Sequence, residues 1–366
     1  MSLKPSESTI LKGLVVVALS VFAASAADAW VADKLPARLQ ARLENRARDI
    51  KWAASLDTEG QLESVVETAK LWVPGSSVRV AFMGGSQELR GAVVQAASQW
   101  LGPEGANLKL DFGVAPGYRN WETGDTSYSA EIRVSFLKDG YWSLVGTDAV
   151  DPEIAGPDEA SLNLEFDRPS DDEFETTVLH EFGHALGFHH EHQHPQEGCE
   201  DEFRWKDQPG YEPTLDAEGC AYTRDRTHRW PGLYRYMSGC PNWWSKADTD
   251  FNLRKLEDAY LYETNGFDGD SVMKYYYEPW MFKDGTNSPC YSAEPEPSLS
   301  DGDKAAAAEA YPPGQDSLEE RIEALRQQLS DLEQELAAAK AAGGARAETV
   351  EALLSGRVAY YRARLP

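Results

Sequence analysis

The chain has few basic side chains for its size. It contains 35 Lys and Arg residues against 61 Asp and Glu residues among 366 residues, which gives a net charge of −26. Nucleic acids bind proteins mainly through Lys and Arg at their phosphates, and the sequence contains no basic patch, P-loop or dinucleotide fingerprint. These absences argue against a nucleic-acid partner, and the acidic balance indicates a well-solvated surface.

Long apolar runs are also missing. The longest uncharged stretch near the start, Gly13–Ala27, has fifteen residues, whereas a membrane helix needs about twenty. It follows Lys4 and Lys12 and contains or precedes two A-x-A sites, Ala24–Ala26 and Ala27–Ala29. This order predicts a signal peptide over residues 1–29, with an uncleaved anchor as the alternative. We therefore expect a secreted, extracellular or periplasmic protein without a stable membrane span after cleavage.

Cysteine is scarce: only four residues occur, and none shows C-x-x-C spacing, which disfavours a cysteine-ligated metal. An even number of cysteines fits two disulfides in an oxidising compartment. Three pairings are open, and pairing of sequence neighbours is expected, Cys199–Cys220 and Cys240–Cys290.

Histidine is scarce outside one short segment, because six of the seven histidines lie between residues 180 and 194. On a helix, His180 and His184 differ by roughly 40° and face the same side one turn apart. Two such imidazoles can share a tetrahedral Zn²⁺. Glu181 lies roughly 100° around the helix, where its carboxylate can reach a metal-bound water as a general base.

A third ligand requires the helix to end. His190 would lie roughly 240° around a continued helix from His184, on the wrong side. Gly187 can end the helix, because glycine adopts the left-handed C′ conformation at little cost. The chain can then turn back and bring His190 to the metal. Three protein ligands leave one position open, which is typical of catalytic zinc.

Residues 180–190 form the motif H-E-x-x-H-x-x-G-x-x-H, which resembles the zinc site of metzincin metallopeptidases. About eighty residues later, the run Ser271-Val-Met-Lys-Tyr275 resembles the methionine turn of the astacin and serralysin branches. The resemblance implies that Met273 packs beneath the metal. It also implies that Tyr275 ligates zinc at rest and swings away to stabilise the tetrahedral intermediate. An ordinary aromatic core strand is the structural alternative for this run.

The residues after the third histidine favour the astacin branch, since Gly187-Phe-His-His-Glu191 is similar to the astacin form G-F-x-H-E. By that resemblance, Glu191 helps to hold the new chain terminus that propeptide removal creates. The other nearby histidines are expected to be loop residues: His189, His192 and His194. The astacin propeptide motif F-x-G-D is absent, because the nearest string, Phe82-Met-Gly-Gly85, lacks the acid.

The expected fold is α+β, a metzincin-type zincin domain with a twisted mixed sheet and an active-site helix above a mostly irregular or helical lower half. Alternating patterns predict strands at residues 108–112, 131–136, 141–146 and 161–166, and a helix at 88–101. By resemblance to astacins, an edge strand near Trp142–Thr147 binds substrate in extended form, and a helix after Leu299–Asp303 closes the domain.

Four segments are predicted: residues 1–29 as the signal peptide, 30–70 as a helical or pro-segment, 71–313 as the catalytic domain, and 316–366 as a helical hairpin or coiled coil. Residues 198–244 read as an irregular, disulfide-tied insertion that forms one wall of the cleft. The tail carries a capping box at Ser317–Glu320 and a break at Gly343-Gly344. Between them runs a leucine-rich seam: Leu318, Ile322, Leu325, Leu329, Leu332 and Leu336. We favour a helical hairpin, docked on the enzyme or tethered to it, over a coiled coil between protomers.

The sequence thus predicts a secreted zinc metalloendopeptidase that acts on polypeptides. Two alternatives stay open at this point: a zinc hydrolase of peptidoglycan peptides, and a metzincin-fold adhesion or binding module. The intact motif argues against the second. The acidic runs Asp248–Asp250 and Asp268–Asp270 could hold calcium, but neither has EF-hand spacing, so zinc is the cofactor that the sequence supports.

Overall fold

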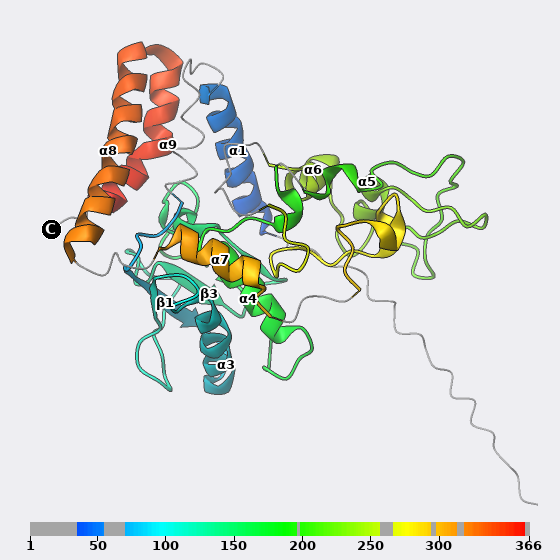
Figure 1. Ribbon diagram of the computed structural model, residues 1–366, viewed down its shortest axis with the longest axis horizontal. Coiled ribbons are helices and arrows are strands. Elements are labelled where there is room, and N and C mark those ends of the chain that lie inside the picture. Colours follow the sequence, from blue (N-terminus) through cyan, green and yellow to red (C-terminus); the bar gives the residue numbers. More distant parts are fainter. Residues whose placement is uncertain are drawn as a thin grey trace, which may run out of the picture.

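The computed structural model describes residues 35–54, 70–195, 198–256, 266–293, 298–312 and 318–362. The predicted signal peptide and Ser317 of the predicted capping box lie outside these residues. A sheet and its helices form one part of the molecule, and a segment carrying short helices extends to one side (Figure 1). A group of three longer helices stands above the sheet.

The sheet has five strands in the order β2-β1-β3-β5-β4. Strand β1 (Ser77–Met83) pairs in parallel with both β2 (Lys109–Asp111) and β3 (Ile132–Ser135), and β3 pairs in parallel with β5 (Leu162–Asn163). Strand β4 (Trp142–Ser143) runs antiparallel to β5 at the edge. The predicted edge strand is therefore present but short, because a 3-10 helix begins at Gly146, whose φ is +51°.

Alternation along β1 divides two apolar clusters between the two faces of the sheet. Val78, Val80 and Phe82 belong to the main core, to which α3 (Gln87–Ala97) and α4 (Phe174–Ala185) contribute their buried faces. Ala81 belongs to the second cluster, on the opposite side, together with Trp142. Helix α7 (Asp301–Ala310) closes the main core through Ala307. The α+β class predicted from sequence is correct.

The lower part of the domain is mostly irregular. Its regular elements are α5 (Leu233–Met237), α6 (Lys246–Leu253) and several short 3-10 helices. An apolar cluster of its own holds it together, in which Phe203 and Phe282 stack at 5.5 Å between ring centroids. An isolated antiparallel bridge also joins these two residues.

The predicted disulfide pairing is wrong. Cys199 bonds Cys290, and Cys220 bonds Cys240, so the second bridge is nested within the first. The isolated β-bridge between Phe203 and Phe282 brings together the two ends of the segment that the Cys199–Cys290 disulfide closes. Inside it, the backbone N–H of Cys240 donates to the carbonyl of Cys220. The inner disulfide joins sequence neighbours, whereas the outer one joins cysteines 91 residues apart that a long-range contact brings together.

Three helices pack as a group on the domain (Figure 1). Helix α1 (Ala37–Ala54) contacts α9 (Gly344–Arg362), which in turn packs along α8 (Leu318–Ala342). Gly343 and Gly344 both have φ of +69°, which separates α8 from α9. Leu39 of α1 is buried in the second apolar cluster. Among the helices in the described ranges, none combines the length and apolar character that crossing a membrane requires.

Candidate metal centre

Helix α4 ends between the second and third histidines of the motif. The N–H of Gly187 donates to the carbonyl of His184 at 2.8 Å, and the N–H of Phe188 donates to that of Gly183 at 3.0 Å. This pair of bonds is the Schellman arrangement, which requires a left-handed C′ residue. Gly187 provides it with φ of +108°. The chain reverses there and leads to His190.

The three histidines of the motif come together. One ring nitrogen from each of His180, His184 and His190 lies within 4.8 Å of the others, and the Nε2 atoms of His184 and His190 are 3.1 Å apart. The Nδ1 atoms face fixed acceptors instead: the carbonyl of Val272 at 2.7 Å, the carbonyl of Phe188 at 2.7 Å and the amide oxygen of Gln193 at 3.1 Å.

These partners assign the tautomers. An Nδ1 atom that faces a carbonyl oxygen must carry the hydrogen, so the lone pair is on Nε2. Three Nε2 lone pairs directed at one point are the donor set that tetrahedral Zn²⁺ takes, and ligand histidines commonly donate their other N–H to an oxygen in this way. The residues present therefore fit a zinc ion.

Glu181 is fully buried in α4, directly after the first of these histidines. The ring of Tyr275 is also buried and packs against two of the three histidines, with centroid distances of 4.2 Å to His190 and 5.7 Å to His180. Tyr275 belongs to the apolar cluster of the lower part as well. Tyr275 therefore lies in an aromatic core and also beside the three histidines.

The turn at Met273 lies directly against α4. A Cβ atom at Gly183 would lie 2.2 Å from the Met273 sulfur and 2.9 Å from the Trp100 ring, so a larger residue there would require both side chains to shift. Asp303 fixes the turn from below: its carboxylate accepts from the Ser271 hydroxyl at 2.6 Å and from the Val272 N–H at 3.0 Å. Neither Gly183 nor Asp303 was predicted from the sequence as part of the site. The Ser300-x-x-Asp303 capping box was the available signal for Asp303.

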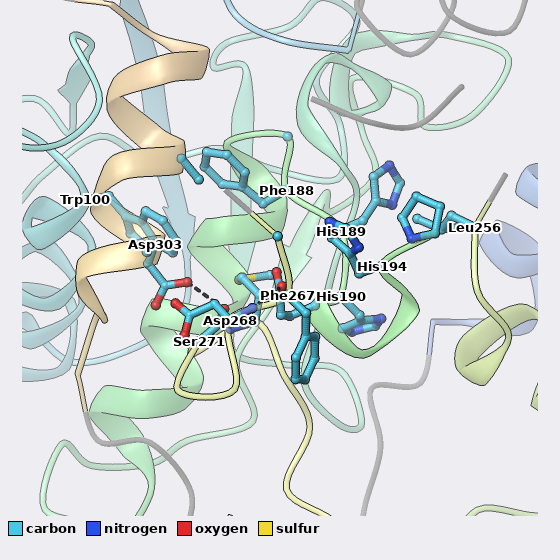
Figure 2. Close-up of a pocket in the computed structure, with 17 residues that line it drawn as sticks. Trp100, Phe188, His189, His190, His194, Leu256, Phe267, Asp268, Ser271 and Asp303 are labelled. Carbon is cyan, nitrogen blue, oxygen red and sulfur yellow. Dashed lines mark hydrogen bonds between the residues drawn. The ribbon is translucent and has the colours of Figure 1, made fainter. Parts of the chain in front are cut away.

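Two cavities adjoin the histidines. One, of about 340 Å³, is lined by Glu191, Asp268 and Asp303. Figure 2 shows Asp268, Ser271 and Asp303 gathered on one side of it and His189, His190 and His194 on the other. Burial raises the pKa of Glu191 to about 7. The Glu191 carboxyl group accepts a hydrogen bond from the Asp268 N–H at 2.7 Å. This bond links the loop after the third histidine to the loop before the methionine turn.

The second cavity, of about 290 Å³, lies between the histidines and the N-terminal helix. Its walls include His184 and His190, the edge-strand residues Trp142 and Ser143, and Phe251 of α6. Helix α1 contributes a further wall through Leu43, Arg46, Ala47 and Ile50. Helix α1 therefore lies beside the edge strand β4, on the side of the strand that faces His184 and His190.

The acidic runs considered for calcium are engaged by protein groups. Asp248 accepts from the Ser245 N–H in the capping box of α6, and Asp250 accepts from the Tyr234 hydroxyl and from Arg254. Asp268 accepts from the Ser300 hydroxyl at 2.6 Å. These bonds give the carboxylates of Asp248, Asp250 and Asp268 partners within the protein.

The comparisons with known proteins give solved structures only. No family model and no curated protein matches the chain. In one structure of myroilysin, identity is 30% over 67% of this chain and 96% of that chain, with a TM-score of 0.48. A second myroilysin structure gives 27%, over 66% and 86%, with a TM-score of 0.41. High choriolytic enzyme 1, a hatching enzyme zinc-protease from Oryzias latipes (Medaka fish), gives 15%, over 64% and 88%, with a TM-score of 0.35.

Proposed function

Since this chain belongs to the astacin family of zinc metallopeptidases, we propose that it is a secreted endopeptidase that cuts polypeptides with Glu181 as the general base. The convergence of His180, His184 and His190, with each Nδ1 held by an oxygen, is the observation that carries the proposal. The two disulfides support an oxidising, extracytoplasmic location.

The chemistry divides between the metal and the side chains. Zinc, when bound, lowers the pKa of a coordinated water toward about 7 and polarises the substrate carbonyl. Glu181 takes the proton from the attacking water and delivers it to the leaving amine. Tyr275 donates its hydroxyl hydrogen to the developing oxyanion, a charge that preorganised donors stabilise strongly.

The substrate in this proposal lies along β4. An extended peptide can pair with the exposed side of an edge strand through backbone hydrogen bonds, and β4 leads toward the cavity that His184 and His190 line. Helix α1 stands beside this strand. We therefore assign residues 30–70 as a pro-segment that restricts access, and the α8–α9 hairpin as the element that docks on it.

Cleavage of casein and gelatin tests the proposal. We expect cleavage that a chelator abolishes and that stoichiometric zinc restores, because the chain's own groups cannot attack an amide without the metal. The assay should include both the unchanged chain and the α1 variant described in the Discussion, so that restricted access is not taken for inactivity. A zinc-loaded, accessible chain that cuts no polypeptide would contradict the proposed activity.

Replacing Tyr275 with phenylalanine should lower kcat by about 10²–10³-fold and leave zinc bound, because one oxyanion donor is lost while three ligands stay. The measurement is kcat on a peptide substrate beside metal content. Tyr277→Phe is the matched control, since Tyr277 is buried in the same cluster and its ring packs on His192. Unchanged turnover in Tyr275→Phe would remove this residue from the mechanism.

A further inference from the structure

Gln193 lies three residues after His190, in the 3-10 turn Glu191–Gln193, and only 4% of it is exposed. Its side-chain amide makes three hydrogen bonds. The Nε2 group donates to the carbonyls of Phe251 and Arg254, both at 2.9 Å. The Oε1 atom lies 3.1 Å from Nδ1 of His190. The amide therefore joins a metal ligand to the end of α6.

The two carbonyls fix which way the amide points. A carbonyl oxygen can only accept, so the Phe251 and Arg254 oxygens require the NH₂ side of the amide. A flipped amide would place Oε1 of Gln193 against the Phe251 and Arg254 carbonyl oxygens, and none of the three could donate a hydrogen bond. With both Nε2 hydrogens used, Oε1 is left to face His190, and Nδ1 of His190 must carry its hydrogen. The lone pair of His190 is then on Nε2, where it can bind zinc.

The three ligands differ in what holds them. Backbone carbonyls orient His180 and His184, so no substitution at Val272 or Phe188 removes those acceptors. A side chain orients His190, and that side chain depends on α6, which lies about sixty residues further along the chain. Two more bonds hold the same junction: His192 Nε2 with the Asn252 carbonyl, and the Leu256 N–H with the Gln193 carbonyl, both at 2.9 Å.

We propose that Gln193 is the positioning residue of the third zinc ligand, because the two carbonyls at the end of α6 aim its amide oxygen at Nδ1 of His190. The inference rests on the proposed zinc site and adds a dependence that the histidine motif does not contain. Loss of a side chain that hydrogen-bonds a ligand histidine typically lowers metal affinity by about 10- to 100-fold.

Two substitutions separate this role from simple packing. Gln193→Met fills a similar volume and offers neither the acceptor nor the donors. Gln193→Glu keeps an oxygen toward Nδ1 of His190 and loses the donors to α6. Both should lower the melting temperature, because both leave the Phe251 and Arg254 carbonyls without their partner. Only Gln193→Met should weaken zinc binding, by about 10- to 100-fold, whereas Gln193→Glu should bind zinc as tightly as the unchanged chain or more tightly.

The zinc dissociation constant is measured on the full chain by competition with a chromophoric chelator. Gln208→Ala is the control, since its amide oxygen accepts from Trp230 elsewhere in the insertion, and it should leave zinc affinity unchanged. Equal losses in Gln193→Met and Gln193→Glu would mean that the α6 anchor alone matters, and no loss in Gln193→Met would also overturn the inference. An unchanged chain that binds no zinc would instead refute the proposed function.

Discussion

Replacing Glu181 with glutamine will reduce turnover of a peptide substrate by about 10²–10⁴-fold and leave the zinc content unchanged. Glutamine has nearly the same shape but cannot take a proton from water, so the loss isolates the general-base step. The three histidines keep their positions, because their Nδ1 partners are two backbone carbonyls and Gln193. The effect should therefore fall on kcat rather than on metal affinity.

The comparison needs a second glutamate on the same helix. Glu175 is exposed on α4, where its carboxylate accepts from the Gln99 amide. Glu175→Gln changes the charge of the helix by the same amount without approaching the ligands, and we expect unchanged turnover. If Glu181→Gln binds zinc and cuts at the original rate, the base is another group and the mechanism proposed above is wrong.

The parts of the site that lie close together in sequence could be predicted from it. The spacing of His180 and His184 fixes a common helix face, and the distance to His190 requires a helix end that a glycine can supply. Such arguments depend on helix geometry and the conformational range of glycine, which act over a few residues. The residue pattern predicted a strand at β4, and the resemblance to astacins implied its position at the edge.

The parts that depend on distant segments could not be predicted. Gln193 is an ordinary polar residue until α6 presents two carbonyls to it. Gly183 matters because Met273 and Trp100, both distant in sequence, pack against it. The disulfide pairing was wrong for the same reason, since the contact of Phe203 with Phe282 brings Cys199 near Cys290. Burial and cross-chain packing decide these positions, and neither is a local property.

Reversing two charges on α1, with Arg42→Glu and Arg46→Glu together, should raise kcat/KM for a long peptide substrate by about 10²- to 10³-fold. Arg42 bonds the Glu159 carboxylate at 2.8 Å, and Arg46 bonds both the Asp151 carboxylate at 2.6 Å and the Leu353 carbonyl of α9 at 2.5 Å. The side chain of Asp151 is only 2% exposed. Breaking a buried pair typically costs about 3–5 kcal/mol, and each 1.4 kcal/mol is about tenfold in an equilibrium constant.

The expected rise in kcat/KM follows from the position of α1. Its residues Leu43, Arg46 and Ile50 form a wall of the cavity that also contains Trp142 of the edge strand and the ligand His190. A substrate that pairs along β4 must displace this wall. The observed kcat/KM is therefore proportional to the fraction of molecules in which α1 has moved away. Glutamates that face Glu159 and Asp151 increase that fraction, and substrates long enough to occupy the edge strand gain most.

Three controls make the α1 experiment decisive. Arg48→Glu places the same charge on the exposed side of α1 and should leave kcat/KM unchanged. Arg42→Glu combined with Glu159→Arg re-forms the ion pair with exchanged charges and should restore most of the restriction. Limited proteolysis of α1 reports its release directly, because a displaced helix is cut faster than a packed one. If α1 becomes susceptible to proteolysis and kcat/KM for the long substrate does not rise, α1 is a helix packed on the domain and does not control access to the edge strand.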